Sequence, residues 1–444
     1  MSKPIVALVG RPNVGKSTIF NAILGERISI VHDTPGITRD RIYGDASWLG
    51  HDFVLIDTGG IEPKDDSNML KAMREQATLA IEAADVIVFI TELKTGLLDA
   101  DSDIAVQLRR SGKPIIHVVN KVDHPGEPPA EFYDFYQLAL GDILPLSGEH
   151  RLGLGELLDA IVEHLPETQE LDTEEQTKVA IIGKPNVGKS SLVNYLTGEN
   201  RAIVSDVAGT TRDAIDIDIT YKEKSYRLID TAGLRRRGKI SDKIEKYSVL
   251  RTVAAVERAE VCLVLIDAQT GVTEQDTKVA GLAHNAGKAS IIVVNKWDSI
   301  EERADKRAEL LLEIKRRFAF MEYAPVVFIS AHTGQNLPKL FKQIDLVAQE
   351  AQKRLSTGVI NDVLAEAMAM NSPPQDKGRS LKIYYATQVA VAPPTIVLFV
   401  NDKELTHFSY DRYLINQFRK NFGFEGSPIR IIWRNRKRDE QEFA

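Results

Sequence analysis

Short apolar runs alternate with amphipathic stretches along most of the chain. In the first half, the runs predict buried strands at residues 5–9, 53–56, 86–90, 115–119 and 143–146. The stretches between them, such as residues 99–112, have the spacing of helices with one apolar face. This alternation predicts an α/β fold in which a mostly parallel sheet carries helices on both faces.

The same pattern occurs twice. Residues 10–40 match residues 183–213 at a constant spacing of 173, and LIDTGG at 55–60 matches LIDTAG at 228–233 with that spacing. NKVD at 120–123 matches NKWD 175 residues later, and residues 143–150 match residues 326–334 at a spacing of 183. Because the spacing grows only between motifs, as insertions in surface loops would make it grow, the sequence predicts two related domains.

A polar, acidic segment at residues 167–177 separates the copies. It predicts a linker between a first domain at 1–166 and a second at 178–352. The tail, residues 353–444, has a different pattern: a helical stretch, two strand-like stretches, a second helix and a last strand. This order, α-β-β-α-β, predicts a small α+β domain.

A Gly-x-x-x-x-Gly-Lys-Ser loop follows the first strand of each copy. Between a strand and a helix, the backbone N–H groups of such a loop face phosphates, the lysine reaches the β- and γ-phosphates, and the serine binds Mg²⁺. One loop alone indicates only some nucleoside triphosphate. The predicted phosphate-binding residues are Gly10, Arg11, Pro12, Asn13, Val14, Gly15, Lys16 and Ser17 in the first copy, and Gly183, Lys184, Pro185, Asn186, Val187, Gly188, Lys189 and Ser190 in the second.

An aspartate ends an apolar strand in each copy, where it can hold the Mg²⁺ shell, and a glycine three residues later can offer its N–H to the γ-phosphate. A threonine in the preceding polar loop can reach the metal only when the γ-phosphate is present, which makes the loop a switch. For Thr38 alone, a turn residue is the alternative. The predicted residues are Thr38, Asp57, Thr58, Gly59 and Gly60 in the first copy, and Thr211, Asp230, Thr231, Ala232 and Gly233 in the second.

The Asn-Lys-x-Asp motifs predict that the base is guanine. The carboxylate accepts the paired N1–H and exocyclic N–H of guanine, and a site built around such an acceptor can reject the wrong base by about 10⁴–10⁵. A backbone N–H of Ser330-Ala331, or of Ser147-Gly148, is expected to face the guanine O6, with a looser loop at the glycine. The motif residues are Asn120, Lys121, Val122 and Asp123 in the first copy, and Asn295, Lys296, Trp297 and Asp298 in the second.

Ile61 and Leu234 follow the Asp-x-x-Gly motifs, beside the expected nucleotide. Many GTPases have a water-orienting glutamine at this place, and an aliphatic side chain cannot replace it. We therefore expect hydrolysis to depend on positioning, on Mg²⁺ and on another positive charge. Lys16, Thr38 and Gly60, with their counterparts Lys189, Thr211 and Gly233, are the catalytic candidates.

The 444 residues carry a net charge of −7. Residues 353–444 hold 14 Lys and Arg against 10 Asp and Glu, a balance of +4, so residues 1–352 carry −11. The single cysteine, Cys262, stands in an apolar run, which excludes a disulfide framework and predicts a core residue. With no apolar run near ~20 residues and no visible leader, the chain is expected to be soluble and cytoplasmic.

The chain has two sets of GTPase motifs followed by a small C-terminal domain. In this it resembles the tandem GTPases called Der or EngA, which are bacterial ribosome-assembly factors. The resemblance covers nearly the whole chain. It implies a KH-like tail and action on the large ribosomal subunit and its rRNA. It also implies that Asn13 and Asn186 hold K⁺. We expect no DNA or membrane partner, and a monomer off the ribosome. The departures are Gly148 for the usual alanine, and Ile37 where the second copy has Thr210.

A literal Gly-x-x-Gly occurs in the tail at residues 423–426. A KH domain clamps RNA with such a loop between two helices. This one lies between a predicted helix and a predicted strand, where glycines serve as a helix stop and a turn. Basic residues of the tail alternate with aromatic residues, most of which we expect to pack in the core. Because no RNA-clamping loop can be recognised, we expect the tail to recognise the shape and the phosphate backbone of folded rRNA more than its bases. The aromatic residues are Tyr384, Tyr385, Phe422 and Trp433.

Three classes of function fit the motifs to different degrees. A regulatory GTPase that binds assembling ribosomes is favoured. A P-loop phosphotransferase is disfavoured by the paired Asn-Lys-x-Asp motifs. A membrane-remodelling or filament-forming GTPase lacks support from a lipidation signal or a basic amphipathic helix.

Overall fold

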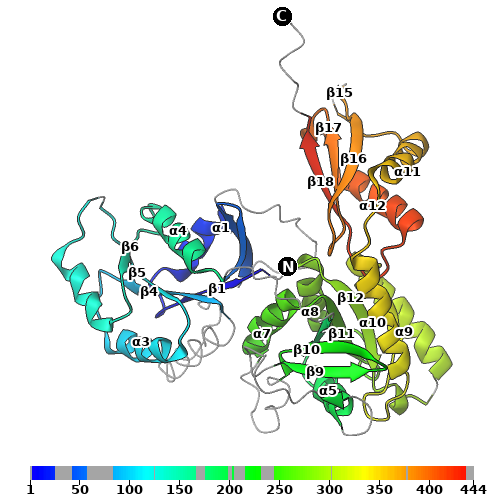
Figure 1. The fold of residues 1–444 in the computed structure, drawn as a ribbon, viewed down its shortest axis with the longest axis horizontal. Helices are drawn as coiled ribbons and strands as arrows, with labels where there is room; N and C mark the ends of the chain where they lie inside the picture. Colours follow the sequence, from blue (N-terminus) through cyan, green and yellow to red (C-terminus); the bar gives the residue numbers. More distant parts are fainter. Residues whose placement is uncertain are drawn as a thin grey trace, which may run out of the picture. The chain divides into compact units, whose positions relative to one another are not determined.

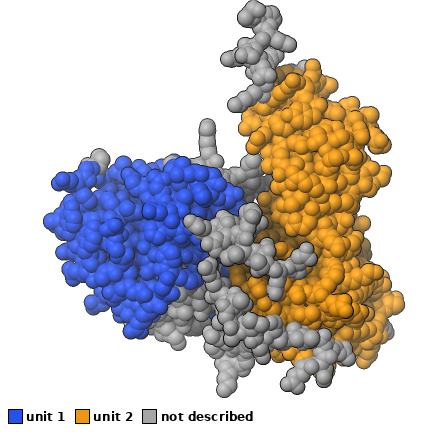
Figure 2. Space-filling model, in the orientation of Figure 1, with its two compact units in different colours: residues 1–173, 240–254 blue, residues 174–239, 255–444 orange. Residues whose placement is uncertain are grey.

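The computed structural model describes residues 3–25, 43–57, 84–124, 126–166, 176–198, 203–204, 216–231, 245–301, 303–376 and 379–436 (Figure 1). The chain divides into two compact units, residues 1–173 with 240–254 and residues 174–239 with 255–444 (Figure 2). The second unit contains both the second sheet and the C-terminal sheet. The boundaries predicted at 166, 177 and 352 stay predictions.

The first unit holds a sheet with the strand order β2-β3-β1-β4-β5-β6. All neighbours are parallel except β2, which runs antiparallel to β3. The predicted strands are confirmed, and β2 is an edge strand that its polar sequence did not predict. The strands are β1 (Ile5–Val9), β2 (Tyr43–Trp48), β3 (His51–Asp57), β4 (Val86–Glu92), β5 (Ile115–Asn120) and β6 (Ile143–Pro145), and the described helices are α1 (Lys16–Gly25), α3 (Asp99–Ser111), η3 (Ala130–Leu138) and α4 (Leu154–His164).

The second sheet repeats this topology with one more strand, in the order β13-β12-β11-β7-β10-β9-β8. Its first strand begins at Thr177, the last residue of the predicted linker. The strands are β7 (Thr177–Ile182), β8 (Ile203–Val204), β9 (Ile217–Tyr221), β10 (Lys224–Ile229), β11 (Val261–Asp267), β12 (Ala289–Asn295) and β13 (Val326–Phe328). The helices are α5 (Lys189–Thr197), α7 (Glu245–Arg258), α8 (Glu274–Asn285), η5 (Trp297–Ser299), α9 (Arg303–Arg317), η6 (Ala319–Met321) and α10 (Leu337–Ala351).

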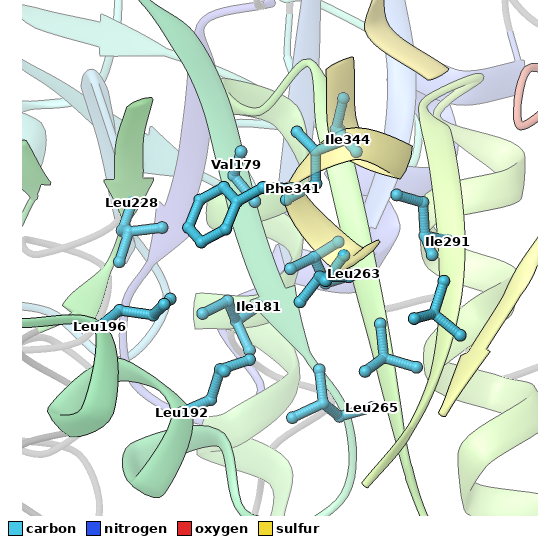
Figure 3. Close-up of a cluster of buried hydrophobic side chains, with 14 of the residues drawn as sticks. Val179, Ile181, Leu192, Leu196, Leu228, Leu263, Leu265, Ile291, Phe341 and Ile344 are labelled. Carbon is cyan, nitrogen blue, oxygen red and sulfur yellow. The ribbon is translucent and has the colours of Figure 1, made fainter. Parts of the chain in front are cut away.

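Both faces of the second sheet are buried, which explains why its strands are continuous apolar runs. Figure 3 shows one face, where Val179, Ile181 and Leu263 meet Phe341 and Ile344 of α10. The alternate residues of the same strands face a second cluster under α8 and α9. The predicted helices on both faces are therefore confirmed. Cys262 lies in that second cluster, as predicted, and burial raises the pKa of its thiol to about 12.

The C-terminal domain follows the predicted order α-β-β-α-β. Its three-stranded sheet has the order β16-β17-β18, with β16 antiparallel and β18 parallel to β17. Two helices cover one face, where Leu398 packs with Leu364 and Phe418. The elements are α11 (Thr357–Met370), β14 (Gln375–Asp376), β15 (Arg379–Ser380), β16 (Ile383–Ala390), β17 (Thr395–Val400), η7 (Lys403–Leu405), α12 (Phe408–Phe422) and β18 (Arg430–Asn435).

The Gly-x-x-Gly loop at residues 423–426 docks this domain onto the second sheet. Gly423 ends α12 with a left-handed φ of 87°. The Phe424 N–H donates to Glu350 Oε2 at 2.6 Å, and Gly426 pairs through its backbone with Tyr323 and Ser290. Gly426 has φ +75°, and a Cβ there would overlap Val347 of α10. The loop is thus a helix stop and a turn, as predicted, and it also forms an interdomain contact.

Candidate nucleotide sites

Each phosphate-binding loop takes the form that its residues require. In the first copy Asn13 has φ 64° and Gly15 has φ 97°, and in the second Asn186 has φ 65° and Gly188 has φ 97°. A Cβ on either glycine would overlap the Nδ2 of the asparagine that begins Asn-Lys-x-Asp. Such successive turns direct backbone N–H groups into one concavity, which suits an anion.

The lysine of each loop lies across the loop itself. Lys16 Nζ donates to the carbonyls of Gly10 at 2.9 Å and Arg11 at 2.7 Å. Lys189 Nζ donates to Gly183 at 2.5 Å and to the next carbonyl at 2.6 Å. Both side chains are buried. The two copies therefore hold an ammonium group in the same place, within the loop that would surround the phosphates.

The structure brings together two of the three predicted Mg²⁺ ligands of the first copy, Ser17 and Asp57. Ser17 Oγ donates to Asp57 Oδ2 at 2.5 Å, at the start of α1 and the end of β3. A hydroxyl and a carboxylate are oxygen donors of the kind Mg²⁺ prefers, so the pair fits the predicted ion.

In the second copy, Asp230 has a left-handed φ of 54°. Its N–H donates to Asp216 Oδ1 at 3.0 Å, and Arg258 pairs with the other oxygen of Asp216. Thr231 is buried directly after it, and Ser190 lies in the first turn of α5. Several predicted residues lie outside the described part of the chain: Thr38, Thr58, Gly59, Gly60, Ile61, Thr211, Ala232, Gly233 and Leu234.

The asparagine of Asn-Lys-x-Asp ties two loops together in both copies. Asn120 Nδ2 donates to Val14 O at 2.7 Å, and its Oδ1 accepts the Gly148 N–H at 3.0 Å. Asn295 makes the same two bonds, to Val187 O at 2.8 Å and from the Ala331 N–H at 2.9 Å. The N–H that was expected to face the guanine O6 therefore donates to the asparagine here, and a base oxygen would have to share it.

The carboxylate of the first base-reading motif is held as an anion. Ser147 Oγ donates to Asp123 Oδ1 at 2.8 Å, and Lys94 lies 3.3 Å from Oδ2. The hydrogen bond from Ser147, and then Lys94, lower the pKa of this carboxyl. Val122 beside it is buried.

In the second copy, Trp297 is buried against Phe328, with ring centroids 4.6 Å apart. Ser330 is buried as well, and its Oγ accepts the Thr333 N–H at 3.0 Å. Asp298 lies just beyond the carboxyl end of β12, directly after that tryptophan. The base-reading motif thus sits on a packed aromatic support.

Sequence reasoning missed two acidic positions in each copy. Arg11 Nε donates to the buried Asp101 at 2.7 Å, and Lys184 Nζ contacts the buried Asp276 at 3.0 Å. Each aspartate also accepts a backbone N–H at the start of its helix. Burial raises the pKa of Asp101, although Arg11 lowers it.

The second missed position pairs with the lysine of Asn-Lys-x-Asp. Lys121 contacts Glu92 at 2.9 Å, and Lys296 contacts Asp267 at 2.6 Å. Lys121 Nζ also donates to the Asn13 carbonyl at 3.0 Å. Both acidic pairs keep the 175-residue spacing of Asn-Lys-x-Asp, so an alignment of the two copies could have found them.

The comparisons with known proteins agree with this geometry. Residues 5–121 and 178–296 match a family model described as "50S ribosome-binding GTPase", and residues 354–434 match "KH-domain-like of EngA bacterial GTPase enzymes, C-terminal". This confirms the predicted KH-like tail.

Two similar relatives are both named GTPase Der. The one from Lachnospira eligens is 58% identical over 443 residues and covers 100% of each chain, and the one from Listeria monocytogenes is 54% identical over 438 residues, covering 98% of this chain and 100% of the other. A solved structure of a variant of Aquifex aeolicus Era bound to GDP and AlF₄⁻ is 27% identical, covers 57% of this chain and 88% of its own, and has a TM-score of 0.31. With two matching G domains, a KH-like tail and full-length similarity, the chain belongs to the Der family of GTPases.

Proposed function

We propose that this chain is a GTP-binding and GTP-hydrolysing switch with two sites, and that it acts in assembly of the large ribosomal subunit. The observation that carries the proposal is a pair of hydrogen bonds that an asparagine makes in the same way in both copies. Asn120 and Asn295 each hold a phosphate-binding loop beside a base-reading motif with matching distances. Two sites of the same construction support binding of the same nucleotide at both.

Each site assigns roles to its own residues. Lys16 and Lys189 contact the β- and γ-phosphates, and Asp123 and Asp298 read guanine. Mg²⁺ neutralises charge on the phosphates when it is bound. In the first site it would be held by Ser17, Asp57 and Thr38, and in the second by Ser190, Asp230 and Thr211.

A K⁺ ion near the phosphates would supply charge that Ile61 and Leu234 cannot. The side chains of Asn13 and Asn186 are exposed at the left-handed turn of their loops. Among the described residues, neither amide side chain is tied down by a hydrogen bond. That leaves both free to face a cation, which supports the proposed K⁺ role over a purely structural one.

The partner we propose is the large subunit and its rRNA, with no DNA or membrane partner. The positive balance of residues 353–444, the KH-like domain and the ribosome-binding description of the matched family support it. Within the described residues, none of the helices could span a membrane. We propose a cytoplasmic protein that is monomeric off the ribosome, with a first G domain at 1–166, a linker at 167–177, a second G domain at 178–352 and the KH-like domain at 353–444.

A change of base specificity tests the nucleotide sites. Asp123→Asn should weaken GTP and favour xanthosine triphosphate at the first site only, and Asp298→Asn should do so at the second. Each variant serves as the matched control of the other. Nucleotide binding is measured by titration with both triphosphates. Two GTP bound per chain at wild-type affinity in either variant would refute the assignment.

Sedimentation tests the partner. The protein loaded with a non-hydrolysable GTP analogue should sediment with the large subunit on a sucrose gradient, and loading with GDP should weaken this association. Absence of the protein from the large-subunit fractions in both nucleotide states would contradict the proposed partner.

A further inference from the structure

The open face of the C-terminal sheet carries a cluster of aromatic and basic side chains. Helices α11 and α12 cover the other face, where Leu398 and Val400 belong to the core. Phe399 lies between them on β17, so its side chain points away from the helices. Its ring stacks on Tyr385 of β16 with centroids 4.4 Å apart and an angle of 13°.

A β-bulge puts two adjacent tyrosines on this face. Ile383 pairs with Val400 and Tyr385 with Phe399, so Tyr384 and Tyr385 together lie opposite one residue of β17. In a regular strand, neighbouring side chains point to opposite faces, and a bulge cancels that alternation. Tyr384 is 47% exposed and Tyr385 40% exposed. Of the four aromatic residues that were expected to pack mostly in the core, Phe422 and Trp433 do so, whereas these two tyrosines do not.

Two arginines complete the cluster. Arg434 pairs with Phe399 across the parallel β17–β18 ladder, so it projects from the same face, and it is exposed. The guanidinium of Arg436 lies 5.3 Å from the centroid of the Tyr384 ring. Within the described part of the chain, neither arginine pairs with a carboxylate. The two charges are thus available to an anionic partner beside the exposed rings.

We propose that Tyr384, Tyr385, Phe399, Arg434 and Arg436 form a stacking platform for unpaired RNA bases. Half-exposed rings on an open sheet offer flat apolar surfaces to bases, and the arginines offer cations to the flanking phosphates. The Gly-x-x-Gly loop, by contrast, is already used in the hydrogen bonds that hold the domain against α10 and β12. The platform deepens the proposed function, since it rests on the ribosomal partner and names unpaired rRNA bases as what this domain binds.

Binding of short RNA tests the platform. Full-length protein is titrated with fluorescein-labelled decauridylate, and with a ten-base-pair RNA duplex as the comparison. The single strand should bind more tightly than the duplex. Tyr384→Ala and Tyr385→Ala should each weaken it roughly 5- to 150-fold, the range for loss of one stacked base. Tyr385→Phe keeps the ring and should bind as the wild type does.

The contribution of the arginines and the position of the bound RNA are tested separately. Arg434→Gln should lower the salt dependence of binding by about one unit of log–log slope. Phe408→Ala, which removes a 65% exposed ring at the start of α12, is the matched control and should have no effect. Photo-crosslinking of 4-thiouridine RNA should label Tyr384 or Tyr385. Crosslinks confined to other residues, or alanine variants that bind as the wild type does, would overturn the proposal.

Sedimentation with the large subunit separates this inference from the proposed function. If the wild type sediments with the subunit but oligonucleotide binding ignores the tyrosines, the platform is wrong and the proposed function stands. If the tyrosines matter for the subunit but not for free RNA, the face binds a ribosomal protein and the platform is again wrong. If the wild type does not sediment, the proposed function is wrong, whereas tyrosine-dependent RNA binding would still support the platform.

Discussion

Replacing Gly148 by alanine should damage the first nucleotide site, although the second site has alanine at the same place. An added Cβ at Gly148 would lie 2.9 Å from Ile19 Cγ1. Ordinary carbon–carbon contacts are about 3.5–4.0 Å, so one group must move by at least roughly half an ångström. Ile19 is fully buried in α1 and has two γ-carbons, which makes its side chain stiff in a helix.

Overpacking of this kind costs about 1–3 kcal/mol. The strain acts on the Gly148 N–H, which donates to Asn120, and Asn120 in turn holds the carbonyl of Val14. We therefore expect guanine nucleotide affinity at the first site to fall roughly 5- to 150-fold. In the second copy Leu192 takes the place of Ile19, and it is buried in the same cluster as Ala331. Because leucine has one γ-carbon, Ile19→Leu should restore the affinity of Gly148→Ala.

The assay is a double-mutant cycle over Ile19 and Gly148. It is carried out in an Asp298→Asn background, so that guanine binding reports the first site. Hydrogen exchange of residues 143–150 reports local stability in the same variants. The coupling energy should favour the double variant by about 1–2 kcal/mol. Unchanged affinity and exchange in Gly148→Ala, or no rescue by Ile19→Leu, would refute the reasoning.

Three further results are expected. GTP hydrolysis should be faster in KCl than in NaCl at equal ionic strength, and equal steady-state rates would exclude the K⁺ role. Burial, and then Arg430, lower the pKa of His284 to about 4 from 6.5. Because the unfolded state alone gains a proton below pH 6.5, the local stability of α8, which carries His284, should fall by about 1 kcal/mol between pH 7.5 and 5.5. Hydrogen exchange checks this, and His284→Gln should abolish the pH dependence. Gly426→Ala should loosen the C-terminal domain, seen as faster proteolysis after α10, whereas Gly50→Ala, with φ +86° and open space, should not.

The two sheets, and the place of the described motifs at the ends of their strands, follow from the sequence alone. Short continuous apolar runs predict segments that are buried on both faces. Glycines and a lysine at fixed spacing after such a run predict a phosphate-binding loop. The duplicated spacing then assigned each motif to the same strand end in both copies. β2 escaped prediction because an edge strand such as YGDASW buries little and needs no apolar run.

Contacts between distant segments emerged only from the folded chain. Asn120 reaches two loops, Arg11 finds Asp101 and Gly426 meets Val347, and each pair joins residues far apart in the chain. The platform shows the same limit within one strand. Simple alternation sends Tyr384 and Tyr385 to opposite faces, and only the pairing of β16 with β17 reveals the bulge that puts both on the open face. Register depends on how two strands pair, so it cannot be predicted from the sequence of one strand alone.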